Sequence, residues 1–116
     1  MEIVKKAWGR EVIFANNDMY CGKLLIHDKA GSKGSMHFHM NKHETFYVQK
    51  GSFRIHFIDT DNANMLSVIL REEETWVNKP GAVHQIEALE DDSIIIEVST
   101  HHEDSDSYRV LPGDGQ

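Results

Sequence analysis

The chain has 116 residues, with 12 Lys and Arg against 19 Asp and Glu, so its formal net charge is −7 at pH 7. This length predicts one domain with a modest core, and the acidic balance, without any run of Lys or Arg, excludes the basic surface that nucleic acids and anionic membranes require. The single cysteine, Cys21, excludes an intramolecular disulfide and is expected to be a small buried residue. No signal-like apolar segment opens the chain, and no apolar run approaches the ~20 residues of a membrane span. We therefore expect a cytoplasmic protein that binds neither nucleic acid nor membrane.

Short segments rich in Ile, Val, Phe, Tyr and Trp follow one another along the whole chain, separated by turns rich in Gly, Asn, Asp and Pro. No segment has the periodicity of a convincing helix. The expected strands lie within residues 11–15, 20–27, 44–49, 52–58, 65–70, 75–78, 83–88 and 93–98. Eight or nine strands at this spacing predict an all-β sandwich or barrel.

No linker, repeat or change in composition divides the chain, so residues 1–116 are expected to form one domain. The last segment turns polar from about residue 101 and is expected to run over the surface. Its "HHED" run, residues 101–104, is interpreted as exposed, because four consecutive side chains do not all reach one ion without an unusual turn. The "REEET" run, residues 71–75, is likewise expected to be solvated.

Alternation along the strands predicts which residues face the core. In residues 52–58, Phe53, Ile55 and Phe57 share one face, and Arg54 and His56 share the other, outward face. Residues 94–96 are apolar on both faces, which is expected of a strand buried on both sides or covered by a second subunit. A homodimer is therefore expected.

The stretch from Gly31 to Gly51 contains a candidate metal site. His37 and His39 lie two residues apart, so on a strand they project from one face with Cα atoms ~6–7 Å apart. Glu44 begins the next strand, and His84, just after a Pro-Gly turn, is the third histidine candidate. Three imidazoles and one carboxylate suit one divalent transition metal, whether Mn, Fe, Co, Ni, Cu or Zn, with positions left for a substrate or water.

The spacing of five residues in this stretch resembles the first motif of the cupin superfamily, with every fixed position filled. These positions are Gly31, His37, His39, Glu44 and Gly51. The second cupin motif is partly present, since Gly81 and His84 match its core. Lys79 replaces a proline, Glu73 a usual glycine and Ala88 a usual asparagine. The resemblance implies a small double-stranded β-helix (jelly-roll) barrel whose metal ligands are His37, His39, Glu44 and His84.

A narrower resemblance covers most of the chain and connects it with the cupin domain of type II phosphomannose isomerases. The matching positions are Trp8, Gly9, Tyr20, Lys23, Glu97 and Arg109. Ala7, Leu24 and Met36 depart from that pattern. The resemblance implies a metal-dependent isomerase or epimerase acting on a sugar or a sugar phosphate, a small-molecule substrate.

An aldose–ketose isomerase needs a cation that polarises the carbonyl and a base that moves a proton between adjacent carbons. The candidates for the base are Lys23, His56 and Glu97. Lys23 and Arg109 are the candidate substrate-binding residues, because their cations suit a hydroxyl or phosphate. Two alternatives remain: an iron-dependent dioxygenase with the same ligands, and a non-catalytic cupin that binds or senses a small molecule.

Overall fold

The computed structural model describes residues 1–115, and it confirms the predicted all-β fold. The strands in this range are β1 (Glu2–Lys6), β2 (Gly9–Asn16), β3 (Cys21–His27), β4 (Met36–Phe38), β5 (Glu44–Lys50), β6 (Ser52–Ile58), β7 (Met65–Arg71), β8 (Thr75–Asn78), β9 (His84–Ala88), β10 (Ser93–Ser99) and β11 (Tyr108–Leu111). The helical element between β10 and β11 is the 3₁₀ turn η1 (Asp104–Asp106). All the strands expected from the pattern are present, and β1, the short β4 and β11 are additional.

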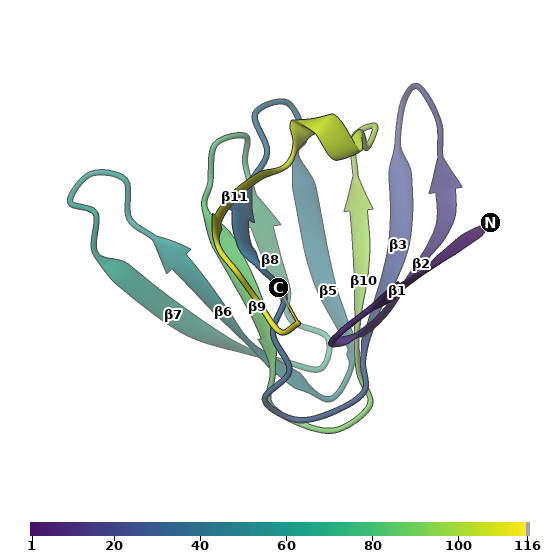
Figure 1. Cartoon of the computed structure of the whole chain (residues 1–116), viewed down its shortest axis with the longest axis horizontal. Coiled ribbons are helices and arrows are strands. Elements are labelled where there is room, and N and C mark those ends of the chain that lie inside the picture. Colours follow the sequence, from purple (N-terminus) through teal and green to yellow (C-terminus); the bar gives the residue numbers. More distant parts are fainter. Residues whose placement is uncertain (116) are drawn as a thin grey trace.

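Two antiparallel sheets form the barrel. One has the strand order β1-β2-β3-β10-β5-β8, and the other has the order β11-β4-β9-β6-β7. Figure 1 shows the sheets spread apart at one end of the molecule and converging at the other, with η1 above the open end. We call these the open end and the closed end. Because β5, β9 and β10 run between the two ends, each contributes side chains to both.

The hydrophobic core fills the closed end and the middle of the barrel. Phe53 and Ile55 of β6 are fully buried, as alternation predicts, and they pack in one cluster with Val48 of β5 and Ile95 of β10. Phe57 is only partly buried, because at the end of β6 it pairs with His84 near the open end. Cys21 is buried, in agreement with its interpretation as a small core residue.

A glycine is required where β5 turns into β6. Gly51 alone separates the two strands, and its φ of 78° lies in the left-handed region that L side chains rarely adopt. A Cβ at this position would also collide with the side chain of Ser93 on β10. The closing glycine of the first motif therefore follows from both backbone conformation and lack of space.

The prediction of an exposed polar tail from residue 101 is only partly right. His101 and His102 are half-buried, while Glu103 and Asp104 are exposed as expected. The chain then forms η1, buries Asp106 at 6% exposure, and adds β11 to the edge of β4. The polar composition is misleading, because a carboxylate can be buried where backbone N–H groups bind it.

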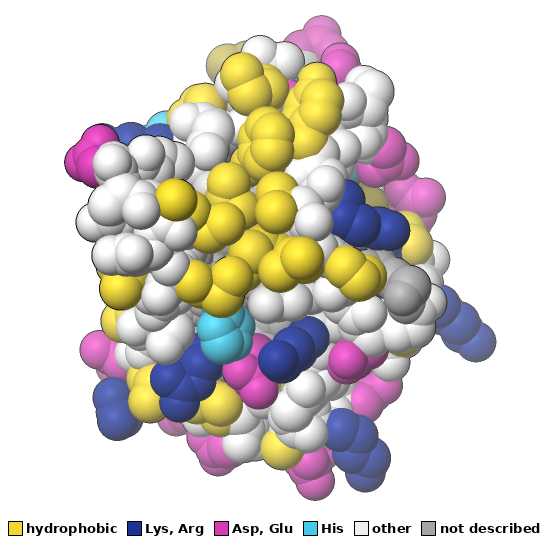
Figure 2. Space-filling model, turned by 60° about the vertical axis from the view of Figure 1, so that its left-hand side comes forward, with side chains coloured by type: hydrophobic (Ala, Val, Ile, Leu, Met, Phe, Trp, Pro, Cys, Tyr) yellow, Lys and Arg dark blue, Asp and Glu magenta, His cyan; other side chains and the backbone are white. Residues whose placement is uncertain are grey.

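Apolar side chains also lie on the outer surface. Figure 2 shows them gathered on one face of the molecule, and the exposed residues of the second sheet include Met65 on β7 with Tyr108 and Val110 on β11. Ile94 and Ile96 of the central strand β10 are partly exposed on the other sheet. The homodimer stays a prediction. No helix in residues 1–115 has the length and hydropathy to cross a membrane.

Candidate metal centre

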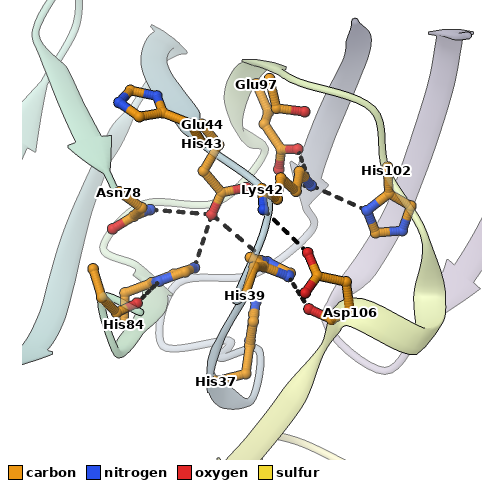
Figure 3. A network of polar contacts seen from close by, with 12 residues as sticks. His37, His39, Lys42, His43, Glu44, Asn78, His84, Glu97, His102 and Asp106 are labelled. Atoms are coloured by element: carbon orange, nitrogen blue, oxygen red, sulfur yellow. Dashed lines mark hydrogen bonds and ion pairs between the residues drawn. The ribbon is translucent and has the colours of Figure 1, made fainter. Parts of the chain in front are cut away.

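Three histidines from two neighbouring strands meet near the open end. His37 lies on β4 and pairs across the sheet with His84, the first residue of β9, while His39 follows directly after β4. Their candidate ligand atoms all lie within 4.8 Å of one another. Figure 3 shows these side chains with Glu44 beside them. Alternation places His37 and His39 on one face, and His84, a residue far along the chain, joins them there.

Hydrogen bonds fix the orientation of all three rings. In each ring Nδ1 lies within hydrogen-bond distance of a backbone carbonyl oxygen: His37 with Ser35 at 3.0 Å, His39 with Asp106 at 2.9 Å, and His84 with Ala82 at 2.9 Å. A carbonyl oxygen only accepts, so each Nδ1 carries a proton, and Nε2 is the ring nitrogen left to face an ion or, in His84, the Glu44 carboxylate. This is the arrangement by which metal-binding histidines are usually held.

Two of the rings, His37 and His39, are also held in the neutral form that a metal requires. Burial lowers the pKa of His37 to about 3, with the neighbouring His84 and His39 adding to the effect. Burial likewise lowers the pKa of His39, although Glu44 partly opposes this. At neutral pH these two nitrogen donors need not lose a proton before they bind an ion.

Glu44 provides a buried carboxylate beside the histidines. Its Oε1 lies 3.0 Å from Nε2 of His84 and 3.8 Å from Nε2 of His39, and it accepts a hydrogen bond of 3.2 Å from Asn78. Burial alone would raise the pKa of Glu44, but His84, Lys42 and His39 together lower it well below its usual range. The carboxylate is therefore charged, as a metal ligand must be.

Lys42 is a buried residue at this site that the sequence reasoning missed. Its Nζ lies 3.3 Å from Oε2 of Glu44, 2.6 Å from Oε2 of Glu97 and 3.1 Å from Nδ1 of His102. Burial would lower the pKa of Lys42, but the two carboxylates raise it, so the ammonium stays charged. The only available signal was its position between His39 and Glu44, which by itself predicts an exposed turn.

This cluster lines a cavity of about 180 Å³. Lys23, Glu97 and Arg109, which are candidates from the sequence, all contribute to its lining together with the three histidines and Glu44. Lys23 is buried and donates to Glu11 at 2.8 Å, whereas Arg109 is exposed. The cavity thus joins the candidate ligands to two of the three candidate bases.

The third candidate base, His56, lies elsewhere. Its ring is on the outer face of the second sheet, as alternation predicts, and its Nε2 lies 2.8 Å from Glu87. Within residues 1–115, the side chains that line the cavity do not include His56. His43, the neighbour of Glu44, is exposed. The structure therefore does not bring either histidine to the cluster.

The donor set fits a divalent transition metal. The three imidazoles lie together, Oε1 of Glu44 lies 3.0 Å and 3.8 Å from two of them, and the backbone carbonyls bind each Nδ1 so that Nε2 is left for the ion. Such mixed N/O sites bind Mn, Fe, Co, Ni, Cu or Zn, and geometry and availability decide among them. His37, His39, His84 and Glu44 are the residues that would hold the ion.

Comparisons with known proteins agree with this architecture. Residues 24–112 match the family model described as Cupin. KdgF from Halomonas sp. superposes with a TM-score of 0.71 at 22% identity, over 83% of this chain and 81% of that one. None of the curated proteins compared with the chain matches it.

Two longer proteins have a similar fold. The capsular polysaccharide assembling protein CapF from Staphylococcus aureus gives a TM-score of 0.80 at 21% identity, over 95% of this chain and 34% of that one. A variant of oxalate decarboxylase from B. subtilis gives 0.82 at 18% identity, over 94% and 30%. The chain therefore spans about a third of each. At these identities the likeness shows the fold alone.

Proposed function

The chain belongs to the cupin family, and from this we propose that it is a metal-dependent enzyme that isomerises or epimerises a sugar or a sugar phosphate. One observation carries the proposal: a cluster of three oriented imidazoles, with a charged carboxylate beside two of them, lines a cavity that is also lined by a buried Lys–Glu pair. The ion would supply the positive charge that polarises a substrate carbonyl. That the substrate is a sugar or a sugar phosphate follows only from the sequence resemblance.

The charges around the cavity favour an anionic ligand. Its ionisable lining, besides the histidines, consists of four cationic and four acidic side chains: Lys6, Lys23, Lys42, Arg109, Glu11, Glu44, Glu97 and Asp104. These balance one another, so a bound divalent ion would leave two positive charges without a partner in the protein. A phosphate group on the substrate would neutralise them.

The size of the cavity limits what it encloses. Its volume of about 180 Å³ is below the ~300–1,000 Å³ of sites that enclose drug-sized ligands. The cavity would therefore hold the carbonyl and the adjacent hydroxyl group, while the rest of the substrate extends outward past Arg109. The exposed guanidinium of Arg109 is suited to bind a phosphate there through two parallel hydrogen bonds.

Glu97 is the best candidate for the base. Its Oε2 is buried, and Nζ of Lys42 lies 2.6 Å away as its ion-pair partner. Burial raises the pKa of Glu97, and the charge of Glu44 adds to this, while Lys42 and Lys23 partly offset it. A carboxylate with a raised pKa can take a proton from one carbon and return it to the next near neutral pH.

Metal content tests the site itself. Purified wild-type protein is expected to contain close to one ion per chain by elemental analysis, and His39→Ala much less, because the variant loses one of four ligands. His56→Ala is the matched control, since it removes an imidazole that lies outside the cavity. Equal metal in wild type and His39→Ala would refute the site. Because the ion binds the folded chain, its removal by a chelator should also lower the melting temperature of the wild type.

Solvent proton exchange tests the reaction. Metal-loaded protein in D₂O is expected to introduce deuterium at the carbon next to the carbonyl of an aldose or ketose phosphate, observed by NMR. Glu97→Gln should reduce this exchange by about 10²–10⁴-fold while leaving the metal bound. Oxygen consumption with iron would instead indicate a dioxygenase. Binding without exchange across a broad panel of sugars would indicate a binding or sensing protein.

A further inference from the structure

We infer that Asp106, in the C-terminal segment, is a positioning residue of the metal centre. Two separate groups of this residue act on the loop that follows β4. Its backbone oxygen lies 2.9 Å from Nδ1 of His39, and its carboxylate accepts hydrogen bonds from the backbone of residues 40–42. The inference rests on the proposed metal site, and it concerns a residue 64–67 positions away from the loop.

The carboxylate of Asp106 caps three consecutive backbone N–H groups. Oδ1 accepts from Met40 at 2.9 Å and from Asn41 at 3.2 Å, and Oδ2 accepts from Asn41 at 3.2 Å and from Lys42 at 3.1 Å. The side chain is buried, at 6% exposure. A buried carboxylate that accepts several N–H bonds is strongly held in one position. The loop between His39 and Glu44 is therefore fixed by the C-terminal segment as well as by its own strands.

Both ends of this loop bear on the metal centre. At one end, the bond to the carbonyl of Asp106 sets the tautomer of His39, so that Nε2 is the atom with the free lone pair. At the other end, the capped N–H of Lys42 places its Nζ between Glu44 and Glu97. Figure 3 shows Asp106 beside His39 and Lys42, on the ribbon of the C-terminal segment. One residue thus positions a ligand and the buried cation beside another ligand.

The test compares two variants that each remove one negative charge from the same segment. Asp106→Asn replaces an accepting oxygen with an NH₂ group that faces backbone N–H donors. Glu103→Gln changes an exposed carboxylate just before η1. Within residues 1–115 this carboxylate pairs with His101 and makes no hydrogen bond or ion pair with the loop after β4. The dissociation constant for Zn²⁺, measured by competition with a chromogenic chelator, should rise about 10–100-fold for Asp106→Asn and less than about twofold for Glu103→Gln.

The result must separate positioning from a general loss of stability. If Asp106 only stabilised the fold, Asp106→Asn would lower the melting temperature of the metal-free protein while its folded form bound Zn²⁺ like wild type, and this outcome would overturn the inference. A wild type that bound no metal would overturn the proposed site instead.

A second measurement needs no variant and applies even if Asp106→Asn does not fold. In the metal-free wild type, ¹⁵N NMR of the histidine rings at pH 7.5 should show His39 with its proton on Nδ1. A proton on Nε2 would contradict the bond to Asp106 and with it the inference.

Discussion

The two ends of the barrel interior are built from the same strands but hold opposite kinds of side chain. At the closed end, Val48 of β5 and Ile95 of β10 pack against Phe53 without exposure. At the open end, the same two strands bring Glu44 and Glu97 to the cavity, both also almost fully buried. Burial therefore does not distinguish a core from a site in this protein. The difference lies in whether the buried groups need polar partners.

The comparison shows how little the strand pattern has to change to build a site. Along β5, Glu44, Phe46 and Val48 occupy successive inward positions, so one step of two residues leads from a metal ligand to the core. Along β9, His84, Ile86 and Ala88 do the same. The closed end supplies the rigidity with which the open end holds its imidazoles and carboxylates.

The largest expected effect comes from emptying the closed end. Phe53→Ala removes a fully buried ring and should lower the free energy of unfolding by about 3–5 kcal/mol, measured by urea denaturation of the metal-free protein. The Zn²⁺ affinity of the molecules that stay folded should change little, because Phe53 has no polar role at the open end. A parallel loss of affinity and stability would show that the two ends are not separable.

The sequence predicted this separation only in part. Alternation identified Phe53 and Ile55 as core and His56 as outward, and the motif spacing joined His37, His39, Glu44 and His84. Lys42 and Asp106 were missed, because a buried charge is recognisable only from its partners. The groups that Asp106 binds lie 64–67 residues away along the chain. Glu97, which pairs with Lys42, lies on the distant strand β10. Contacts of this kind depend on the folded topology and leave no local pattern.

Acid should act on the barrel interior through His27, which also contributes to the lining of the cavity. This residue is 1% exposed and stacks on Trp8 with ring centroids 4.3 Å apart. Burial lowers its pKa from 6.5 to about 4, with Ser32 partly opposing the shift. Between these two values the unfolded chain binds a proton that the folded chain does not, so stability is lost as pH falls from 6.5 to 4 and is fully present above 6.5.

The loss attributable to His27 should reach roughly 3 kcal/mol at about pH 4. It is measured as the free energy of unfolding of metal-free wild type between pH 7.5 and 4, compared with that of His27→Gln, which has no titrating ring. The metal is removed so that the pH dependence of its binding does not enter the comparison. The titration of His37 changes the stability of the wild type and of His27→Gln equally. If both proteins lost stability with the same pH dependence, His27 would not be the buried neutral group described.

The smallest effect concerns a turn that borders the closed end. Glu73, between β7 and β8, has a φ of 70°, and its N–H donates to Val48 at 2.9 Å. This position is the one where the second motif usually has glycine, so the backbone keeps the left-handed conformation although the residue has a Cβ. Glu73→Gly should therefore raise the free energy of unfolding by up to about 1 kcal/mol, measured by urea denaturation.

Glu72→Gly is the control in the same turn, since Glu72 is not among the residues with positive φ and its Oε1 accepts a hydrogen bond of 3.0 Å from Gly51. The control should lose stability, and a loss in both variants would mean that the left-handed backbone at Glu73 carries no strain.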